Sequence, residues 1–268
     1  MADRPVWLIG CGNMAGAMLA GWLMAGEDPS RFTAVRPSGA PVADNVPVTS
    51  SLPDTTFGDA IVQLGFKPHM LGDIAPEMQP LVGPETVIVS ILAGVELATL
   101  RAAFPDAGQI VRAMPNTPVA LGKGAVGLIA EDRNDARATQ IAALMGELGI
   151  AEWIADETLF DVVTALSGSG PAFLFRFIDA LARGGEALGL EAGRAQRLAI
   201  ATVQGAAELA ARSDVDPGML ANRVASPGGS TRKGLDILDG DDALIDLVRD
   251  TLEAATRRNR EMAAEARG

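Results

Sequence analysis

The sequence predicts an α/β protein in which a doubly wound parallel sheet is followed by an all-helical domain. Three observations lead to this class. Short apolar runs alternate with helical patterns over about the first 155 residues, a glycine-rich turn directly follows the first run, and no convincing strand pattern occurs after Ala155. We therefore expect two domains, at residues 1–155 and 156–268.

The first domain consists of strand and helix patterns that alternate along the chain. Apolar runs predict strands at 6–9, 32–35, 60–64, 86–92 and 109–114, with further edge strands at 124–129 and 151–154. Helical patterns lie at 13–24, 69–82, 96–103 and 134–148. This alternation predicts a largely parallel sheet covered on both faces.

The second domain shows helical patterns only. They cover 158–166, 171–188, 192–212 and 241–263, and Gly and Pro clusters separate them. The sequence S-G-S-G-P at 167–171 interrupts one helical stretch. Because Pro171 removes a helical hydrogen bond, we expect a helix start or a kink there.

The composition is that of a globular chain and argues against several classes of function. The 268 residues are 48% hydrophobic and 21% charged, enough to bury a sizeable core. A net charge of −12, from 22 basic and 34 acidic residues, disfavours nucleic acid as a partner. The single cysteine, Cys11, excludes a disulfide framework, and with the single histidine, His69, it leads us to expect no metal site. We interpret His69 as a helix-start residue rather than a proton donor.

An uncharged stretch at 6–26 is long enough to span a membrane. It contains Asn13 and five glycines, and the residues before it include both Asp3 and Arg4, so they form no net positive leader segment. A strand, a glycine turn and a buried helix explain the same residues. We therefore expect a cytoplasmic protein without membrane contact.

The glycine-rich turn at 10–16 (G-C-G-N-M-A-G) has the G-x-G-x-x-(A/G) spacing of a dinucleotide site. The first glycine permits the tight turn, the second lets a pyrophosphate approach the backbone, and the small Ala15 lets the helix pack closely on its strand. Amide groups at the helix N-terminus then face the phosphates. A turn used only for packing is the alternative, but the flanking strand and helix favour a Rossmann-like site. We expect cofactor contacts from Gly10, Gly12, Asn13 and Met14.

The end of the second strand selects the nucleotide. NAD enzymes usually place an acidic residue there to bind the ribose 2′-hydroxyl, and here the strand ends in A-V-R-P-S without an acid. Arg36 can pair with a 2′-phosphate through its planar guanidinium, and Ser38 can donate a hydroxyl to it. We predict that NADPH is preferred and that NADH is used more weakly, although a solvated loop can also carry an arginine.

Beyond the glycine turn, five further motifs follow one another along the chain. They are F-K-P at 66–68, S-I-L-A-G-V at 90–95, V-R-A-M-P-N-T-P at 111–118, L-S-G-S-G-P-A at 166–172 and V-A-S-P-G-G-S-T at 224–231. Together they resemble the pyrroline-5-carboxylate reductase family over nearly the whole chain, and the last two motifs are the most specific. The resemblance implies reduction of L-1-pyrroline-5-carboxylate to L-proline, the last step of proline biosynthesis, by hydride transfer from a nicotinamide.

The resemblance also implies roles for loops that follow strands. Ala93 with Gly94, and Asn116, lie after strands, where a doubly wound sheet binds ligands, and the family uses these loops for the nicotinamide half. Lys67 and Pro68 also follow a strand, and we expect Lys67 to face the cofactor. Only three lysines occur in the chain. A surface lysine is the alternative.

The segment 224–231 resembles the family's substrate loop. Its glycines expose successive amides, which with the hydroxyl groups form an anion nest suited to a carboxylate. Thr231 matches the family threonine that hydrogen-bonds the imine nitrogen, and with Lys67 it is a candidate catalytic residue. A helix cap is the alternative role for Ser230 or Thr231. We expect substrate contacts from Val224, Ser226, Gly228, Gly229, Ser230, Thr231 and Asp214.

The resemblance further implies at least a homodimer, because the family's helical domain intertwines with a second copy, and larger rings of dimers also occur. This chain departs from the family's pattern at several positions. Leu52 replaces an Asn that helps to hold the ribose, and Asn222 replaces a frequent Asp. Ser230 stands where Thr or Ala is frequent, and Asp214 where a longer Glu can lie near the substrate.

Two other classes of function remain as alternatives. One is another NADP-dependent imine reductase or a β-hydroxyacid dehydrogenase with the same two-domain plan, although the latter generally needs a lysine in the helical region at 158–188, which has none. The other is a non-catalytic NADP-binding sensor, which would need the glycine turn but not the loop at 224–231.

Overall fold

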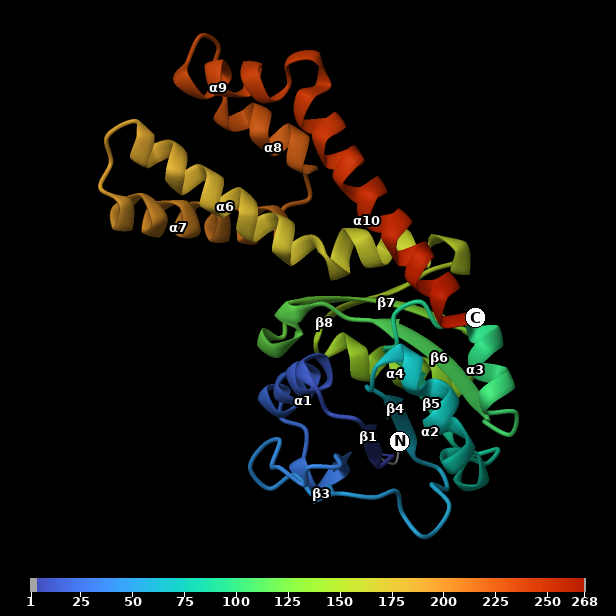
Figure 1. The fold of residues 1–268 in the computed structure, drawn as a ribbon. Coiled ribbons are helices and arrows are strands. Elements are labelled where there is room, and N and C mark those ends of the chain that lie inside the picture. Colours follow the sequence, from blue (N-terminus) through green and yellow to red (C-terminus); the bar gives the residue numbers. More distant parts are fainter. Residues whose placement is uncertain (1–3, 268) are drawn as a thin grey trace. The chain divides into compact units, whose positions relative to one another are not determined.

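The computed structural model describes residues 4–267 and confirms the predicted fold class (Figure 1). The chain forms two compact units. The first comprises the chain up to Ser169 together with the segment from Ala255 onward, and the second comprises Gly170–Ala254.

The first unit contains a mostly parallel sheet with the strand order β3-β2-β1-β4-β5-β6-β7-β8. Only the pairing between β6 and β7 is antiparallel. The strands are β1 Val6–Ile9, β2 Phe32–Val35, β3 Val48–Thr49, β4 Ile61–Leu64, β5 Val87–Ser90, β6 Gln109–Met114, β7 Gly124–Ala130 and β8 Gly149–Trp153. Because β1, β2, β4, β5 and β6 are parallel, their carboxyl ends lie at one edge of the sheet.

Helices cover both faces of this sheet, as the sequence predicts. One face packs against α1 (Asn13–Ala25) and α4 (Ala136–Gly146), and the other against α2 (Leu71–Met78) and α3 (Leu97–Ala103). The uncharged segment at 6–26 is part of this core, since Met18, Leu19 and Trp22 of α1 are fully buried. It therefore packs inside the protein, as expected from the sequence.

The structure differs from the predicted elements in detail. The strand β3 was not expected, because a pairing of two residues leaves no apolar period to detect. The strand β7 is not an edge strand, since it pairs on both sides, whereas β8 is one. The helix expected at 69–82 is divided into η2 (Pro68–Met70), α2 and η3 (Gln79–Leu81), because prolines interrupt its hydrogen bonds.

The helical stretch expected at 158–166 is also divided. It consists of η5 (Glu157–Leu159), α5 (Phe160–Val163) and a π-helical turn, η6 (Thr164–Gly168), in which the Ser169 amide bonds the Thr164 carbonyl at 3.0 Å. The predicted helix start near Pro171 is confirmed, because α6 begins at Gly170 directly after this turn.

The second unit is helical throughout. It contains α6 (Gly170–Ala187), α7 (Ala192–Ala211), α8 (Pro217–Val224), α9 (Ser230–Leu238) and the beginning of α10 (Ala243–Arg267), and α6 and α7 pack side by side (Figure 1). The helix α8 was not predicted, whereas the alternative role of Ser230 or Thr231 as a helix cap implied a helix at the position of α9. Asp216 followed by Pro217 was a helix-start signal, and the Asp216 side chain accepts a hydrogen bond from the Met219 amide at 3.0 Å.

Large apolar side chains of the second unit are exposed. The exposed apolar residues on α6 and α7 include Leu174, Phe175, Phe177, Leu198 and Leu209. Within the described residues, Glu157–Ala187 is the one helical stretch that is long and apolar enough to cross a membrane, and most of it is not buried here.

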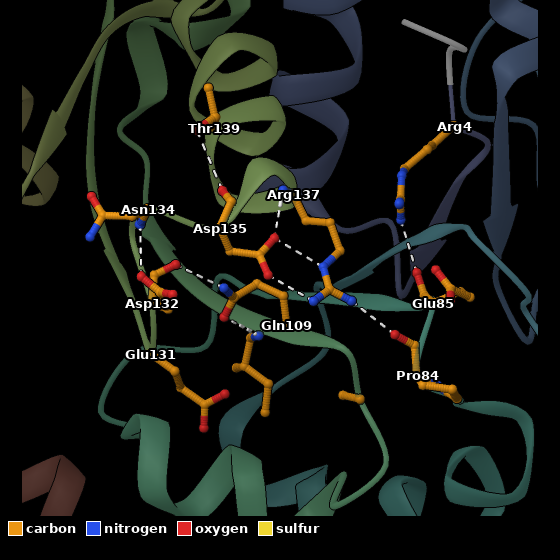
Figure 2. Close-up of polar contacts among 12 residues, drawn as sticks. Arg4, Pro84, Glu85, Gln109, Glu131, Asp132, Asn134, Asp135, Arg137 and Thr139 are labelled. Carbon is orange, nitrogen blue, oxygen red and sulfur yellow. Dashed lines mark hydrogen bonds and ion pairs between the residues drawn. The ribbon is translucent and has the colours of Figure 1, made fainter.

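Polar contacts join the amino-terminal side of the sheet to α4 (Figure 2). Asp135 caps α4 by accepting a hydrogen bond from the Arg137 amide at 2.7 Å, and its carboxylate also binds the Arg137 guanidinium at 2.7 and 3.0 Å. Arg137 in turn donates to the Pro84 carbonyl at 2.9 Å. Gly108 is required here, because a Cβ atom would lie 1.9 Å from that carbonyl oxygen.

This network predicts an acid-sensitive contribution to stability. Hydrogen bonds from Arg137 hold the pKa of Asp135 at about 2, below its ordinary 3.8. The contribution is therefore present above about pH 4 and is lost as the pH falls toward 2. Asp135→Asn keeps a cap-forming side chain but removes the charge, so we expect a loss of roughly 1 kcal/mol at pH 6 that shrinks steadily below pH 4.

Urea unfolding of both proteins at several pH values tests this prediction. Glu131→Gln, which removes a carboxylate from the more exposed pair with Arg101, is the matched control. A destabilisation by Asp135→Asn that stays the same from pH 6 to pH 3 would contradict it.

Candidate active site

The first group of predicted site residues lies at one edge of the sheet. Gly10, Arg36, Lys67, Ala93 and Asn116 follow β1, β2, β4, β5 and β6 respectively, and these five strands are parallel. The topology therefore gathers at one edge the loops predicted to bind the cofactor. Ligands of doubly wound sheets bind at this edge.

The glycine turn is held against two neighbouring strands. Gly10 has a φ of +78°, and its amide donates to the Val35 carbonyl at 3.0 Å. On the other side, a Cβ atom on Gly65 would lie 2.3 Å from the Gly10 carbonyl oxygen. Side chains at these positions would separate the ends of β1 and β4. Gly65 was not identified from the sequence, although a glycine directly after an apolar run was the available signal.

The start of α1 is open in the way that a phosphate group requires. Gly12 is the N-cap residue, and a Cβ atom placed on it would meet nothing within 4 Å. Asn13 is exposed and Met14 is half-buried. The first turn contains no acidic residue and the cap has no side-chain hydrogen bond, so the positive end of the helix dipole is not compensated.

Arg36 lies beside this turn at the end of β2. Its Nη1 atom donates to the Ala40 carbonyl at 3.2 Å, which bends the side chain over its own loop and leaves it half-buried. Burial raises the pKa of the Cys11 thiol, and the charge of Arg36 acts in the opposite direction. Ser38 is exposed on the same loop. A planar guanidinium and a hydroxyl group therefore stand together beside the glycine turn.

Lys67 and Pro68 lie where the F-K-P motif was expected, directly before and at the start of η2. Lys67 is exposed and Pro68 is half-buried. His69 lies in the same short helix immediately before α2, in agreement with its interpretation as a helix-start residue. Leu52 packs against the apolar core, so its side chain supplies no polar group to a ribose.

The Asn116 side chain is engaged within the protein. Its Oδ1 atom accepts a hydrogen bond from the Ala125 amide at 2.9 Å, and its Nδ2 atom donates to the Ser167 carbonyl at 3.0 Å. Asn116 is buried, so these bonds are little weakened by water. They join the loop after β6 both to β7 and to the π-helical turn.

A buried arginine in β6, Arg112, supports the loop that follows this strand. Arg112 in β6 forms an ion pair with Glu157, and its guanidinium lies 4.4 Å from the ring centroid of Phe160. The same Glu157 carboxylate accepts a hydrogen bond from the Leu97 amide at 2.8 Å, at the start of α3. The available sequence signal for this anchor was a charged residue inside an otherwise apolar strand, and Arg112 was not among the predicted site residues.

The Ala93–Gly94 loop is in contact with the far end of the chain. Gly94 has a φ of +77°, and a Cβ atom on it would lie 3.0 Å from the Cα atom of Ala263 in α10. Ala263 is only 5% exposed, and Asn259, one turn earlier, donates to the Asp161 carbonyl at 3.1 Å. The last turns of α10 therefore support the loop after β5.

The predicted substrate residues lie in the second unit. Residues 226–229 form a tight turn in which the Gly229 amide donates to the Ser226 carbonyl at 3.0 Å and Gly228 has a φ of +71°. The turn leads into α9, whose N-cap is Gly229 and has no side-chain cap hydrogen bond. Neither Ser230 nor Thr231 therefore caps this helix, and both are exposed, as are Val224, Ser226, Gly228 and Asp214.

Among the residues that the structure describes, no group of three or more His, Cys, Asp or Glu side chains has the arrangement of a metal site. The arrangement is instead a glycine turn with a guanidinium beside it in one unit and a glycine-rich, hydroxyl-bearing loop in the other.

Known proteins with the same organisation are similar over the whole chain. The chain is 36% identical to a pyrroline-5-carboxylate reductase of Pseudomonas aeruginosa over 99% of each chain, and 35% identical to the one of Pisum sativum over 95% of this chain and 94% of the other. A family model of pyrroline-5-carboxylate reductase dimerisation matches residues 157–262.

The chain belongs to the pyrroline-5-carboxylate reductase family.

Solved structures agree with this assignment. A pyrroline-5-carboxylate reductase of Coxiella burnetii superimposes with a TM-score of 0.87 at 31% identity, over 97% of this chain and 98% of the other. The Plasmodium falciparum enzyme with NADP bound has the same fold, with a TM-score of 0.82 at 24% identity over 98% and 99% of the chains. The family predicted from the motifs is confirmed.

The contact between Gly94 and Ala263 predicts an effect on cofactor binding. Ala263→Leu inserts three carbon atoms where the loop and helix touch, so we expect the apparent KM for NADPH to rise about tenfold, because the loop after β5 is displaced. Ala264→Leu, on the exposed neighbouring position, should leave it unchanged. Steady-state kinetics with a thermal melt of each variant provide the measurement; equal NADPH constants in all three proteins would disprove the effect.

Proposed function

We propose that this protein reduces L-1-pyrroline-5-carboxylate to L-proline with a hydride from NADPH, and that the residues described above carry this reaction. The assignment rests on family membership over 99% of the chain. Within the structure, the observation that supports it best is the carboxyl edge of the sheet, where the open N-terminus of α1 lies beside Arg36. The protein is an NADPH-dependent oxidoreductase that acts on a cyclic C=N bond.

The reaction makes modest chemical demands on the protein. NADPH, when bound, supplies the hydride, which adds to the imine carbon while the C=N electron pair moves to nitrogen. A protonated imine is already an electrophile, so most of the rate enhancement can come from holding two ligands in the right geometry.

For the cofactor, we infer contacts from the glycine turn and from four loops. The amides at the start of α1 bind the pyrophosphate, Arg36 and Ser38 bind the 2′-phosphate, and NADH is therefore used more weakly. Lys67 faces the reacting atoms from its exposed position after β4. The remaining contacts are made by Pro68, Ala93, Gly94 and the backbone at Asn116, whose side chain acts as a positioning group.

For the substrate, we infer that the loop at 224–231 binds the carboxylate. The exposed amides and hydroxyl groups at the start of α9 form an anion nest, and the Thr231 hydroxyl hydrogen-bonds the imine nitrogen. Asp214 completes the substrate residues. Residues 1–155 would then serve as the dinucleotide-binding domain and 156–268 as the dimerisation and substrate-binding domain.

We also infer a homodimer in the cytoplasm, with a larger ring of dimers as a further form. The match of residues 157–262 to the dimerisation model covers the whole of the apolar stretch Glu157–Ala187 and includes most of the exposed apolar side chains. A second copy rather than lipid therefore covers them. The acidic net charge of −12 supports an assignment without nucleic acid.

The direct test is the loss of NADPH absorbance on addition of pyrroline-5-carboxylate, with NADH in parallel. We expect faster oxidation of NADPH, and we expect Arg36→Ala to raise the KM for NADPH about tenfold while changing that for NADH little. Arg133→Ala, at an exposed position, is the control. Equal use of both nucleotides by the natural protein would overturn the role of Arg36 but not the reaction, and no oxidation of either nucleotide would overturn the reaction.

The role of Thr231 is tested by paired substitutions. Thr231→Ala should lower kcat at least tenfold with little change in the Kd for NADPH, because the hydroxyl contact forms with the imine. Thr231→Ser keeps the hydroxyl and should recover most of the turnover. A Thr231→Ala protein with unchanged kcat would rule out this role.

A further inference from the structure

An arginine and an asparagine are hydrogen-bonded across the two ends of the proposed substrate loop. Asn222 lies in the last turn of α8 and Arg232 is the third residue of α9. The Nη2 atom of Arg232 donates to Oδ1 of Asn222 at 2.8 Å. The bond therefore closes the loop at its base and fixes the position of a guanidinium beside it.

The charge of this guanidinium is not neutralised by its partner. The Asn222 side chain is neutral, and among the described residues no carboxylate forms an ion pair with Arg232. The next residue along the chain is different, because Lys233 pairs with Asp236 at 3.3 Å. Arg232 thus presents an uncompensated charge, while the neighbouring lysine does not.

The position of Arg232 makes this arrangement unfavourable without an anion. The first turn of α9 contains no acidic residue, and the helix dipole is positive at that end, so a cation there is repelled. Ser226, Gly228, Ser230 and Thr231 of the adjoining loop are exposed. A negatively charged ligand bound at the loop would relieve the repulsion at Arg232, and a neutral ligand would not.

We propose that Arg232, held in place by the neutral Asn222, is a specificity-determining residue that selects a carboxylate-bearing imine at this loop. The inference rests on the proposed function, because it takes the loop at 224–231 as the substrate site. Asn222 matters through its lack of charge, since an aspartate at the same position would keep the hydrogen bond but cancel the positive charge.

Four variants separate the charge of Arg232 from its structural role. Arg232→Met should raise the KM for pyrroline-5-carboxylate about tenfold and leave the KM for NADPH and the melting temperature nearly unchanged. Asn222→Asp, which retains the bond geometry, should raise the same KM several-fold. Arg232→Lys keeps a positive charge and should raise the KM for pyrroline-5-carboxylate less than Arg232→Met does. Lys233→Met, which removes a charge from the same turn, should leave this KM unchanged.

Salt dependence and a neutral substrate provide independent readouts. The substrate KM of the natural protein should rise with ionic strength more steeply than that of Arg232→Met, because screening weakens the attraction to a half-exposed charge. The uncharged imine 1-pyrroline should be reduced equally well by both proteins. A KM for pyrroline-5-carboxylate that Arg232→Met and Asn222→Asp leave unchanged would overturn the proposal.

Asn222→Asp remains a decisive test even if Arg232→Met folds poorly. The aspartate has nearly the same volume as the asparagine and keeps the oxygen that accepts the hydrogen bond from Arg232. If that variant binds substrate as well as the natural protein, the charge has no role. If the natural protein itself does not oxidise NADPH with pyrroline-5-carboxylate, the proposed function fails, and this result is distinct from either variant's behaviour.

Discussion

The close backbone approach at Gly10 and Gly65 is the constraint on which the carboxyl edge of the sheet depends. A Cβ atom on Gly65 would lie 2.3 Å from the Gly10 carbonyl oxygen, and the Gly10 amide is bonded to the end of β2. Three parallel strands can thus end close together with the N-terminus of α1 open between their loops. The open start of α1 follows from this packing of backbone rather than from any side chain.

Buried polar groups hold the loops on the other half of the same edge. Asn116 bonds β7 and the π-helical turn, while Arg112 and Glu157 connect β6 to the start of α3. Each of these groups is costly to bury without partners, so their bonds leave the loops few alternative positions. The V-R-A-M-P-N-T-P motif therefore acts as a structural anchor, because much of its polar chemistry is directed into the protein.

The second unit differs from the first because many of its large apolar side chains are exposed. Two of its helices, α7 and α8, have side-chain caps at Glu191 and Asp216, yet many large apolar side chains of the unit remain exposed. The caps of these two helices thus form within one chain, whereas much of the unit's apolar surface is left unburied. These side chains fall largely within residues 157–262, which match the model of pyrroline-5-carboxylate reductase dimerisation.

The sequence by itself determined the α/β class, the glycine turn, the approximate position of most elements and the family. Those features depend on local periodicity, on turn chemistry and on motifs of contiguous residues. The tertiary structure decided what depends on contacts between distant segments. It showed that the Asn116 amide is occupied by Ala125 and Ser167, that Ala263 supports Gly94 and that Arg232 is held by Asn222. It also corrected β7 from an edge strand to an interior one. No local pattern encodes such pairings, because they arise only when the packed chain brings the partners within hydrogen-bond or van der Waals distance.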